Sequence, residues 1–122
     1  MELLMMMNAY ELLCNFENTL RSYITHNMNE HYGIGWYIKA PSVEKHLPYK
    51  KDFSSLNLHD LIAMVAAYDC LKRSCDKQDI RKLRIINPIR NKIAHSRKLS
   101  NEEYDKLYNA YLILDRAINN ES

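Results

Sequence analysis

The sequence predicts an all-helical fold, a four-helix up-and-down bundle. Its 122 residues include only two glycines and three prolines, which argues against a protein with many strands and tight turns. Apolar residues recur at spacings of three and four over several stretches, the period of an amphipathic helix. With 47% hydrophobic and 26% charged residues, the composition is that of an ordinary globular protein. We therefore expect one domain, residues 1–122, with a core large enough to fold without disulfide bonds or a structural metal ion.

The first helix is expected over about residues 3–29. Its periodic apolar residues are Ala9, Leu12, Leu13, Phe16, Leu20, Tyr23, Ile24 and Met28. Residues 31–37 contain both glycines of the chain, Gly33 and Gly35, which favour the end of a helix and a chain reversal. We expect Trp36 to anchor this reversal in the core rather than to stack on a ligand.

Residues 38–56 are expected to form a long connection. They contain Pro41 and Pro48 and show no sustained apolar period. We therefore interpret them as irregular, with or without a short helical turn. Connections of this length are uncommon and are often functional or mobile.

The second helix is expected over about residues 58–73. Asn57 is a favourable N-cap, with Asp60 at the third helical position. His59 and Asp60 are adjacent, so they lie on different faces of the helix. We therefore interpret Asp60 as a capping residue and not as half of a catalytic dyad with His59.

The third helix begins near Asp76 or Lys77 and meets Pro88 partway along. A proline inside a helix removes one hydrogen bond and clashes with the preceding turn, whereas Asn87 and Pro88 suit the N-cap and the first helical position. We therefore expect this helix to be kinked, or to restart, near Pro88. Either outcome places residues 90–95 in the first turns of a new segment, where free amides and the helix dipole favour an anion.

The fourth helix has the clearest start signal in the chain. Ser100 and Glu103 have the spacing of a capping box, and Leu99 and Tyr104 are placed as a hydrophobic staple across it. The apolar period then continues to about Asn119.

Positive charge is concentrated in one segment, from Lys72 to Lys98. That segment contains ten Lys or Arg residues and two acidic residues, whereas the rest of the chain contains seven basic and thirteen acidic residues. The net charge of +2 therefore conceals a basic element in an otherwise acidic protein. Such a cluster is typical of proteins that bind a phosphate-bearing partner.

Within this segment, residues 90–95 form the one constellation that suggests chemistry. Asn91 and His95 are four residues apart and share a helix face. Arg90 diverges from His95 by about 140°, but its long side chain can reach back toward that face. The opposite, buried stripe of the helix is expected to consist of Ile86, Ile89 and Ile93.

The pattern of Arg90, Asn91, Ala94 and His95 resembles the signature of the HEPN superfamily of small helical domains, whose ribonuclease members carry an arginine shortly before a histidine. The order of the four expected helices is similar to that of the superfamily over nearly the whole chain. Only the connection at residues 38–56 has no counterpart in the family pattern. The resemblance implies a homodimer whose active site lies at the subunit interface, with both motifs contributing and with products that end in a 2',3'-cyclic phosphate.

Carried over by position, this resemblance gives Arg90 the role of stabilising phosphate charge and His95 a role in proton transfer. It implies that Asn91 orients the histidine or the phosphate. An imidazole donates or accepts protons near neutral pH, and a guanidinium makes two parallel hydrogen bonds to phosphate oxygens. From charge alone, we expect further RNA backbone contacts from Lys92, Arg97, Lys98 and Arg84. No residues have the spacing of metal ligands, so we expect no metal and no other cofactor.

The sequence therefore leads to a first hypothesis of a metal-independent endoribonuclease, a toxin or phage-defence effector. An antitoxin or other regulatory protein is a candidate partner, and the sequence leaves open whether it controls the activity. A second hypothesis is a noncatalytic module of the same fold that binds RNA, a nucleotide or a partner protein. A third is a structural helical dimer that uses the methionine-rich N-terminus and Tyr104, Tyr108 and Tyr111. RNA cleavage in excess chelator separates the first hypothesis from the other two.

The N-terminal run from Leu3 to Met7 is apolar but has no basic flank, and polar residues soon interrupt it. We therefore expect neither a signal peptide nor a membrane span. Methionines in such a run indicate an adaptable packing surface, for example at a subunit contact. Three cysteines without paired metal spacing indicate reduced thiols, so we expect a cytoplasmic protein.

Overall fold

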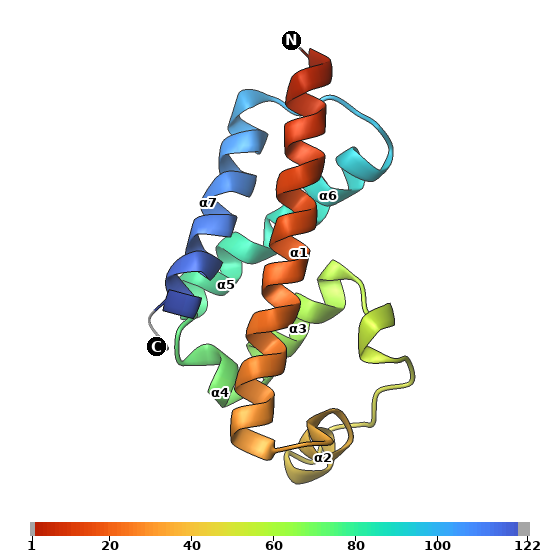
Figure 1. Cartoon of the computed structure of the whole chain (residues 1–122), viewed down its shortest axis with the longest axis vertical. Coiled ribbons are helices and arrows are strands. Elements are labelled where there is room, and N and C mark those ends of the chain that lie inside the picture. The colour runs from red at the N-terminus through yellow and green to blue at the C-terminus, as the bar shows by residue number, and fades with distance from the viewer. Residues whose placement is uncertain (1, 120–122) are drawn as a thin grey trace.

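The computed structural model describes residues 2–119, and all regular structure within them is helical (Figure 1). The all-helical prediction is therefore confirmed. The elements are α1 (Glu2–Tyr32), α2 (Trp36–Val43), the 3-10 turn η1 (Phe53–Ser55), α3 (Leu58–Ala67), α4 (Asp69–Lys72), α5 (Lys77–Arg84), α6 (Ile86–Ala94) and α7 (Asn101–Asn119).

Helix α1 is the long element against which the others pack. Figure 1 shows α7 alongside its N-terminal half, α3 and α4 against its C-terminal half, and α5 and α6 crossing behind it. Within the described residues, no helix combines the length and apolarity needed to cross a bilayer.

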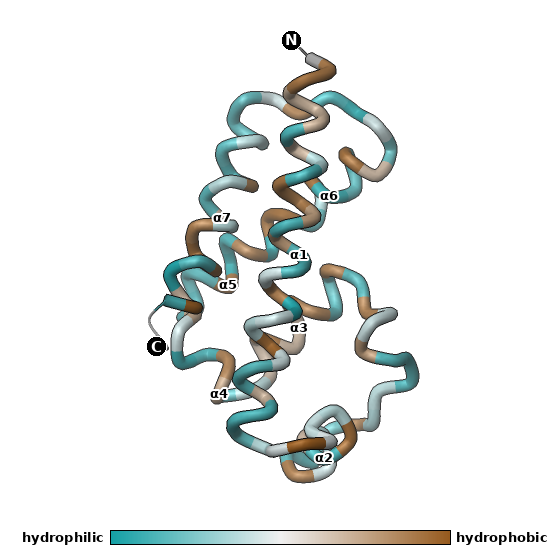
Figure 2. The backbone as a smooth tube through the Cα atoms, viewed as in Figure 1, coloured by the Kyte–Doolittle hydropathy of each residue, from teal (hydrophilic) through white to brown (hydrophobic). Residues whose placement is uncertain are grey.

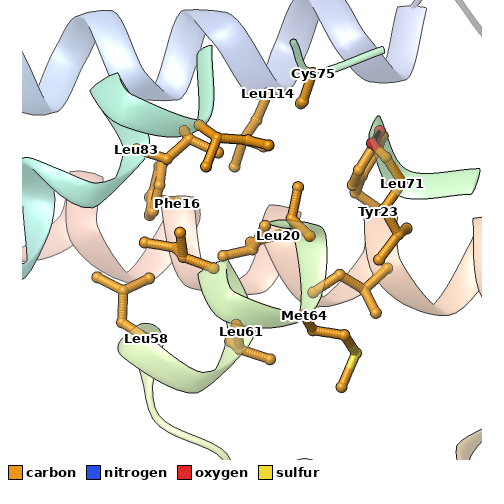
Figure 3. Packing of buried hydrophobic residues seen from close by; sticks show 14 of the residues in the cluster. Phe16, Leu20, Tyr23, Leu58, Leu61, Met64, Leu71, Cys75, Leu83 and Leu114 are labelled. Carbon is orange, nitrogen blue, oxygen red and sulfur yellow. Dashed lines mark hydrogen bonds between the residues drawn. The ribbon is translucent and has the colours of Figure 1, made fainter. Parts of the chain in front are cut away.

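The core lies where α1 meets the helices on both halves. Phe16, Leu20 and Tyr23 of α1 face residues of α3, α5 and α7 in Figure 3 and are almost completely buried. The Tyr23 hydroxyl donates a hydrogen bond of 2.6 Å to the carbonyl of Leu71, so the one polar atom of this ring is satisfied. The predicted stripe of the first helix is thus the centre of the core.

The reversal after α1 uses both glycines. Gly33 and Gly35 have φ angles of 86° and 82°, in the left-handed region that only glycine adopts without strain. Trp36 follows and is 8% exposed, with its ring centroid 5.2 Å from that of Phe53 in an edge arrangement. The prediction that Trp36 is a core anchor is confirmed.

The connection after Trp36 is more ordered than the sequence suggests. Its first part is helix α2, which places Pro41 in its last turn and buries Ala40. In its second part the rings of Tyr37 and Tyr49 stack with centroids 4.7 Å apart, and the Tyr49 hydroxyl donates to Tyr68 at 3.2 Å. Aromatic packing, which has no period in sequence, therefore holds this segment against the bundle.

The second predicted helix begins as expected and is interrupted earlier than expected. The Asp60 amide donates to the Asn57 side chain at 2.9 Å, and the Asn57 amide to the Asp60 carboxylate at 3.4 Å, which confirms the capping role of both residues. The prediction of one helix over residues 58–73 was wrong, because Tyr68 has extended backbone and separates α3 from α4. This backbone lets the buried Tyr68 ring contact the rings of Tyr32 and His46.

The third predicted helix is divided into α5 and α6 at Ile85, whose backbone stays in the right-handed helical region. The first residue of α6 is Ile86, whereas Pro88 was expected to be the first residue of the new segment. The segment therefore starts two residues earlier than expected, and Pro88 is its third residue. A proline has no amide to donate to the carbonyl four residues earlier, here that of Arg84, so the helical ladder is interrupted at this point.

Helices α5 and α7 are joined by a polar contact as well as by apolar packing. The Asp79 amide donates to Asp76 at 2.8 Å in the capping box of α5, and the buried Asp79 carboxylate also accepts from Arg116 of α7 at 2.6 Å. The predicted capping box of α7 is confirmed, since the Glu103 amide donates to Ser100 at 3.1 Å and the Ser100 amide to Glu103 at 2.9 Å.

Replacing Asp79 should therefore test the junction of α5 and α7. Asp79→Ala removes one side of the capping box and leaves Arg116 without its anion, so we expect a loss of about 2 kcal/mol in the free energy of unfolding. Urea unfolding monitored by circular dichroism measures this change. Asp105→Ala, at an exposed position of α7, is the matched control and should change stability by less than about 0.5 kcal/mol. Equal stability of the two variants would contradict the proposed importance of this contact.

Candidate functional site on helix α6

Helix α6 presents the motif because its other side is held in the core. Ile86 and Ile89 are buried and Ile93 is partly buried against the same cluster, so the predicted apolar stripe is confirmed. The side chains between these positions face outward. Arg90 and Asn91 therefore lie on the surface of a helix whose orientation is fixed from behind.

Arg90 and Asn91 line a hollow of about 250 Å³ between α6 and the start of α3, here called the α3–α6 hollow. Its other lining residues are Asn57, Leu58, His59 and Asn87. Figure 1 shows the first turn of α3 directed toward α6. No carboxylate lines this hollow, which contains one guanidinium, one imidazole and three carboxamides. Such a set of groups suits a negatively charged ligand.

Arg90 is half-buried as a residue and, within residues 2–119, its guanidinium has no ion-pair or hydrogen-bond partner. Two other cations of the molecule are engaged: Arg116 pairs with Asp79 at 2.6 Å, and Lys92 pairs with Glu103 at 2.7 Å. A half-buried arginine without an anion gains no ion-pair stabilisation within the chain. Arg90 is therefore the residue of the motif that most clearly fits a ligand role.

His95 lies outside the α3–α6 hollow. It is the exposed C-cap of α6, with φ −97° and ψ 13°, and its amide donates to the Asn91 carbonyl at 3.1 Å. The structure thus brings Arg90 and Asn91 together in one hollow, while the imidazole of the same chain stands at the end of the helix.

A second hollow, of about 360 Å³, lies between α1 and the C-terminal end of α6 and is here called the α1–α6 hollow. Its lining residues are Ile93, Ser96, Arg97 and Leu99, together with Leu3, Met6, Met7, Ala9 and Tyr10 of α1. Leu3 is 71% exposed, Met7 60% and Tyr10 62%, and Figure 2 shows this apolar character at the N-terminal end of α1. An apolar surface therefore adjoins the end of the motif.

The chain turns away from α6 through a left-handed residue. Ser96 has a φ of 56°, its amide donates to Ile93 at 3.0 Å, and the Arg97 amide donates to Lys92 at 2.8 Å. These bonds close the last turn of α6 and direct the chain back toward α1. The turn therefore fixes the backbone of His95 next to Ser96 and Arg97, which line the α1–α6 hollow.

The residues expected to contact RNA by charge alone differ in their surroundings. Arg84, Arg97 and Lys98 are exposed. Lys92 instead pairs with Glu103 and so joins α6 to α7. The hydrogen bond from Lys92, together with the one from the Ser100 amide, lowers the pKa of Glu103 below its usual range. A phosphate at Lys92 would have to compete with the Glu103 carboxylate.

His59 is the residue near the motif that sequence reasoning did not select. It lines the α3–α6 hollow together with Arg90, although the two residues are far apart in the sequence. The one local signal in the sequence is a histidine in the first turn of an expected helix, off the apolar face. In the structure His59 is exposed, whereas Leu58 and Leu61 are buried. Only the packing of α3 against the bundle makes this position part of the candidate site.

Comparison with known proteins adds one finding to this geometry. Neither a curated protein nor a solved structure matches the chain. The model of a family described as Swt1-like HEPN matches residues 11–119, a region that includes most of α1, all later helices and the complete Arg90 to His95 motif. The chain therefore belongs to the Swt1-like HEPN family.

Proposed function

We propose that this protein is a metal-independent endoribonuclease whose active site is completed by a second copy of the chain. The observation that carries the proposal is the unpartnered Arg90 guanidinium, which lies in a hollow without carboxylates and precedes an exposed His95 in a member of the HEPN superfamily. RNA is the substrate class that this combination of positive charge and an imidazole suits best.

The proposed reaction is a transesterification within the RNA chain. The 2'-oxygen forms a bond to phosphorus, the bond from phosphorus to the 5'-oxygen breaks, and the product ends in a 2',3'-cyclic phosphate. One group accepts the proton of the 2'-hydroxyl and another donates a proton to the leaving 5'-oxygen. We assign proton transfer to His95, stabilisation of the phosphate charge to Arg90, and orientation of the phosphate or the imidazole to Asn91.

A homodimer would supply the groups that one chain lacks. One motif contains one histidine, whereas the reaction has two proton transfers, and two motifs across a two-fold axis provide two of each group. The exposed apolar residues of α1 beside the α1–α6 hollow support an interface next to the motif. Each chain of this dimer would be a single domain. Its four-helix bundle would consist of α1, α3 with α4, α5 with α6, and α7.

The activity is suited to a toxin or phage-defence effector in the cytoplasm, held inactive by an antitoxin or other regulatory partner. Uncontrolled RNA cleavage damages the cell that produces the enzyme. The same apolar surface at the end of α1 would then be available either to a second copy of the chain or to that partner.

A noncatalytic RNA-binding or nucleotide-binding module is the second candidate. One observation favours it: a single chain brings Arg90 and Asn91 into one hollow but leaves His95 outside it. That hollow alone can hold a phosphate without transferring protons through His95.

Substitution of the motif should separate these two functions. We expect His95→Ala to reduce RNA cleavage in excess chelator at least about a hundredfold, because it removes the proton-transfer group. It should bind RNA as wild type does. Arg90→Ala should reduce both cleavage and affinity, because it removes a phosphate contact. Products are measured on labelled RNA by gel electrophoresis, and affinity by fluorescence anisotropy.

His26→Ala, at an exposed position of α1 away from the motif, is the matched control and should cleave as wild type does. Equal cleavage by wild type and His95→Ala would refute the enzyme proposal. Salt-dependent binding without cleavage by any of these proteins would instead support the noncatalytic module.

The proposed interface can be tested independently of the motif. Met7→Asp places a charge on the exposed apolar end of α1, so we expect the dimer to dissociate and cleavage to fall at least tenfold at micromolar concentration. Leu47→Asp is the control, since Leu47 is 89% exposed in the connection after α2. Sedimentation measures the oligomeric state, and circular dichroism verifies that both variants are folded. A wild-type monomer with full activity would exclude the composite site.

A further inference from the structure

We propose that His59 contacts the same RNA phosphate as Arg90, which makes the α3–α6 hollow a phosphate subsite formed by two helices. This inference rests on the proposed function for the identity of the ligand. It assigns a substrate-binding role to a residue outside the Arg90 to His95 motif. The evidence is the position of His59, the chemical composition of the hollow and the absence of competing partners among the described residues.

The position of His59 is fixed by its neighbours in the first turn of α3. Leu58 is buried, which anchors the turn in the core. The Asn57 side chain accepts the Asp60 amide, and the Asp60 carboxylate accepts the Asn57 amide, so both capping side chains are engaged. The His59 imidazole remains exposed and, within residues 2–119, has no hydrogen-bond or ion-pair partner.

The acidic residue of this turn, Asp60, is not among the residues that line the α3–α6 hollow. Asp60 lines a different cavity, of about 420 Å³, together with Ala63 and Met64 on another side of α3. The α3–α6 hollow contains Arg90 and His59 with the carboxamides of Asn87 and Asn91, and no carboxylate. Each of these polar groups can donate a hydrogen bond to a phosphate oxygen.

The two helices offer complementary contacts to one anion. Arg90 supplies a permanent positive charge and a forked pair of donors from α6. His59 supplies a nitrogen donor from α3. Because the helices belong to different parts of the core, a phosphate held by both is fixed in position as well as bound. Such fixation would orient the neighbouring ribose relative to the group that transfers the proton.

The test uses an RNA oligonucleotide that is 2'-O-methylated throughout, so that it cannot be cleaved, and the full-length chain. We expect His59→Ala to weaken its binding about tenfold, as expected for loss of one hydrogen bond to a charged group. His59→Gln, which retains a side-chain N–H donor, should recover most of the affinity. The His26→Ala control should bind as wild type does. Binding is measured by fluorescence anisotropy at fixed salt.

A double-mutant cycle shows whether His59 and Arg90 act on one phosphate. If they do, the double variant His59→Ala/Arg90→Ala should lose less affinity than the two single losses combined, because the remaining contact is already disrupted in each single variant. Fully additive losses would place the two residues on separate phosphates and overturn the shared subsite. Wild-type affinity in His59→Ala would overturn the role of His59 altogether.

Cleavage kinetics on unmodified RNA distinguish this inference from the proposed enzyme. His59→Ala should raise KM about tenfold and change kcat less than about threefold, because it removes binding that is present before the reaction. A loss of kcat as large as that of His95→Ala would overturn the binding role and make His59 a proton-transfer group. If wild type cleaves no RNA, the enzyme proposal fails, while the binding and cycle results still decide the subsite.

Discussion

Burial of the apolar stripe of α1 is the constraint on which the remaining structure depends. Phe16, Leu20 and Ile24 are completely buried, and α1 contacts α2, α3, α4, α6 and α7. Burial of one such side chain stabilises the folded state by about 1.5–3 kcal/mol. The short helices α3, α4, α5 and α6 have little stability by themselves. The orientation of α3, α4 and α6 therefore depends on packing against α1, and this includes the direction in which α6 presents its polar face.

The two basic residues Lys92 and Arg90 of α6 differ in whether the chain supplies an anionic partner. Lys92 pairs with Glu103, which belongs to the capping box of α7, so this cation contributes to the position of α7. Arg90 is half-buried and has no such anion among residues 2–119. A fold selected for stability alone would supply a carboxylate at that position or replace the arginine. An unsatisfied guanidinium beside donors from a second helix is instead what a site for an external anion requires.

Local signals in the sequence predicted the starts of α3 and α7 and the apolar faces of the helices. Asn57 and Ser100 mark the starts of α3 and α7 because a capping box is made by residues three apart. The break at Tyr68 was not predictable, because it depends on rings of Tyr32 and His46 that come from other parts of the chain. The same limit applies to the candidate site. Arg90 and Asn91 could be selected from their spacing, whereas His59 joins them only through the packing of α3 near α6.

The two hollows beside α6 divide the motif between surfaces that suit different partners. The α3–α6 hollow is polar and holds Arg90 and Asn91, whereas the α1–α6 hollow is largely apolar and adjoins the C-terminal end of α6. A phosphate fits the first, and a protein surface fits the second. Affinity for RNA would therefore depend on salt and on one chain, whereas the environment of His95 would depend on what covers the end of α1. In the proposed arrangement, a partner at α1 would control proton transfer by His95 without occupying the proposed phosphate subsite.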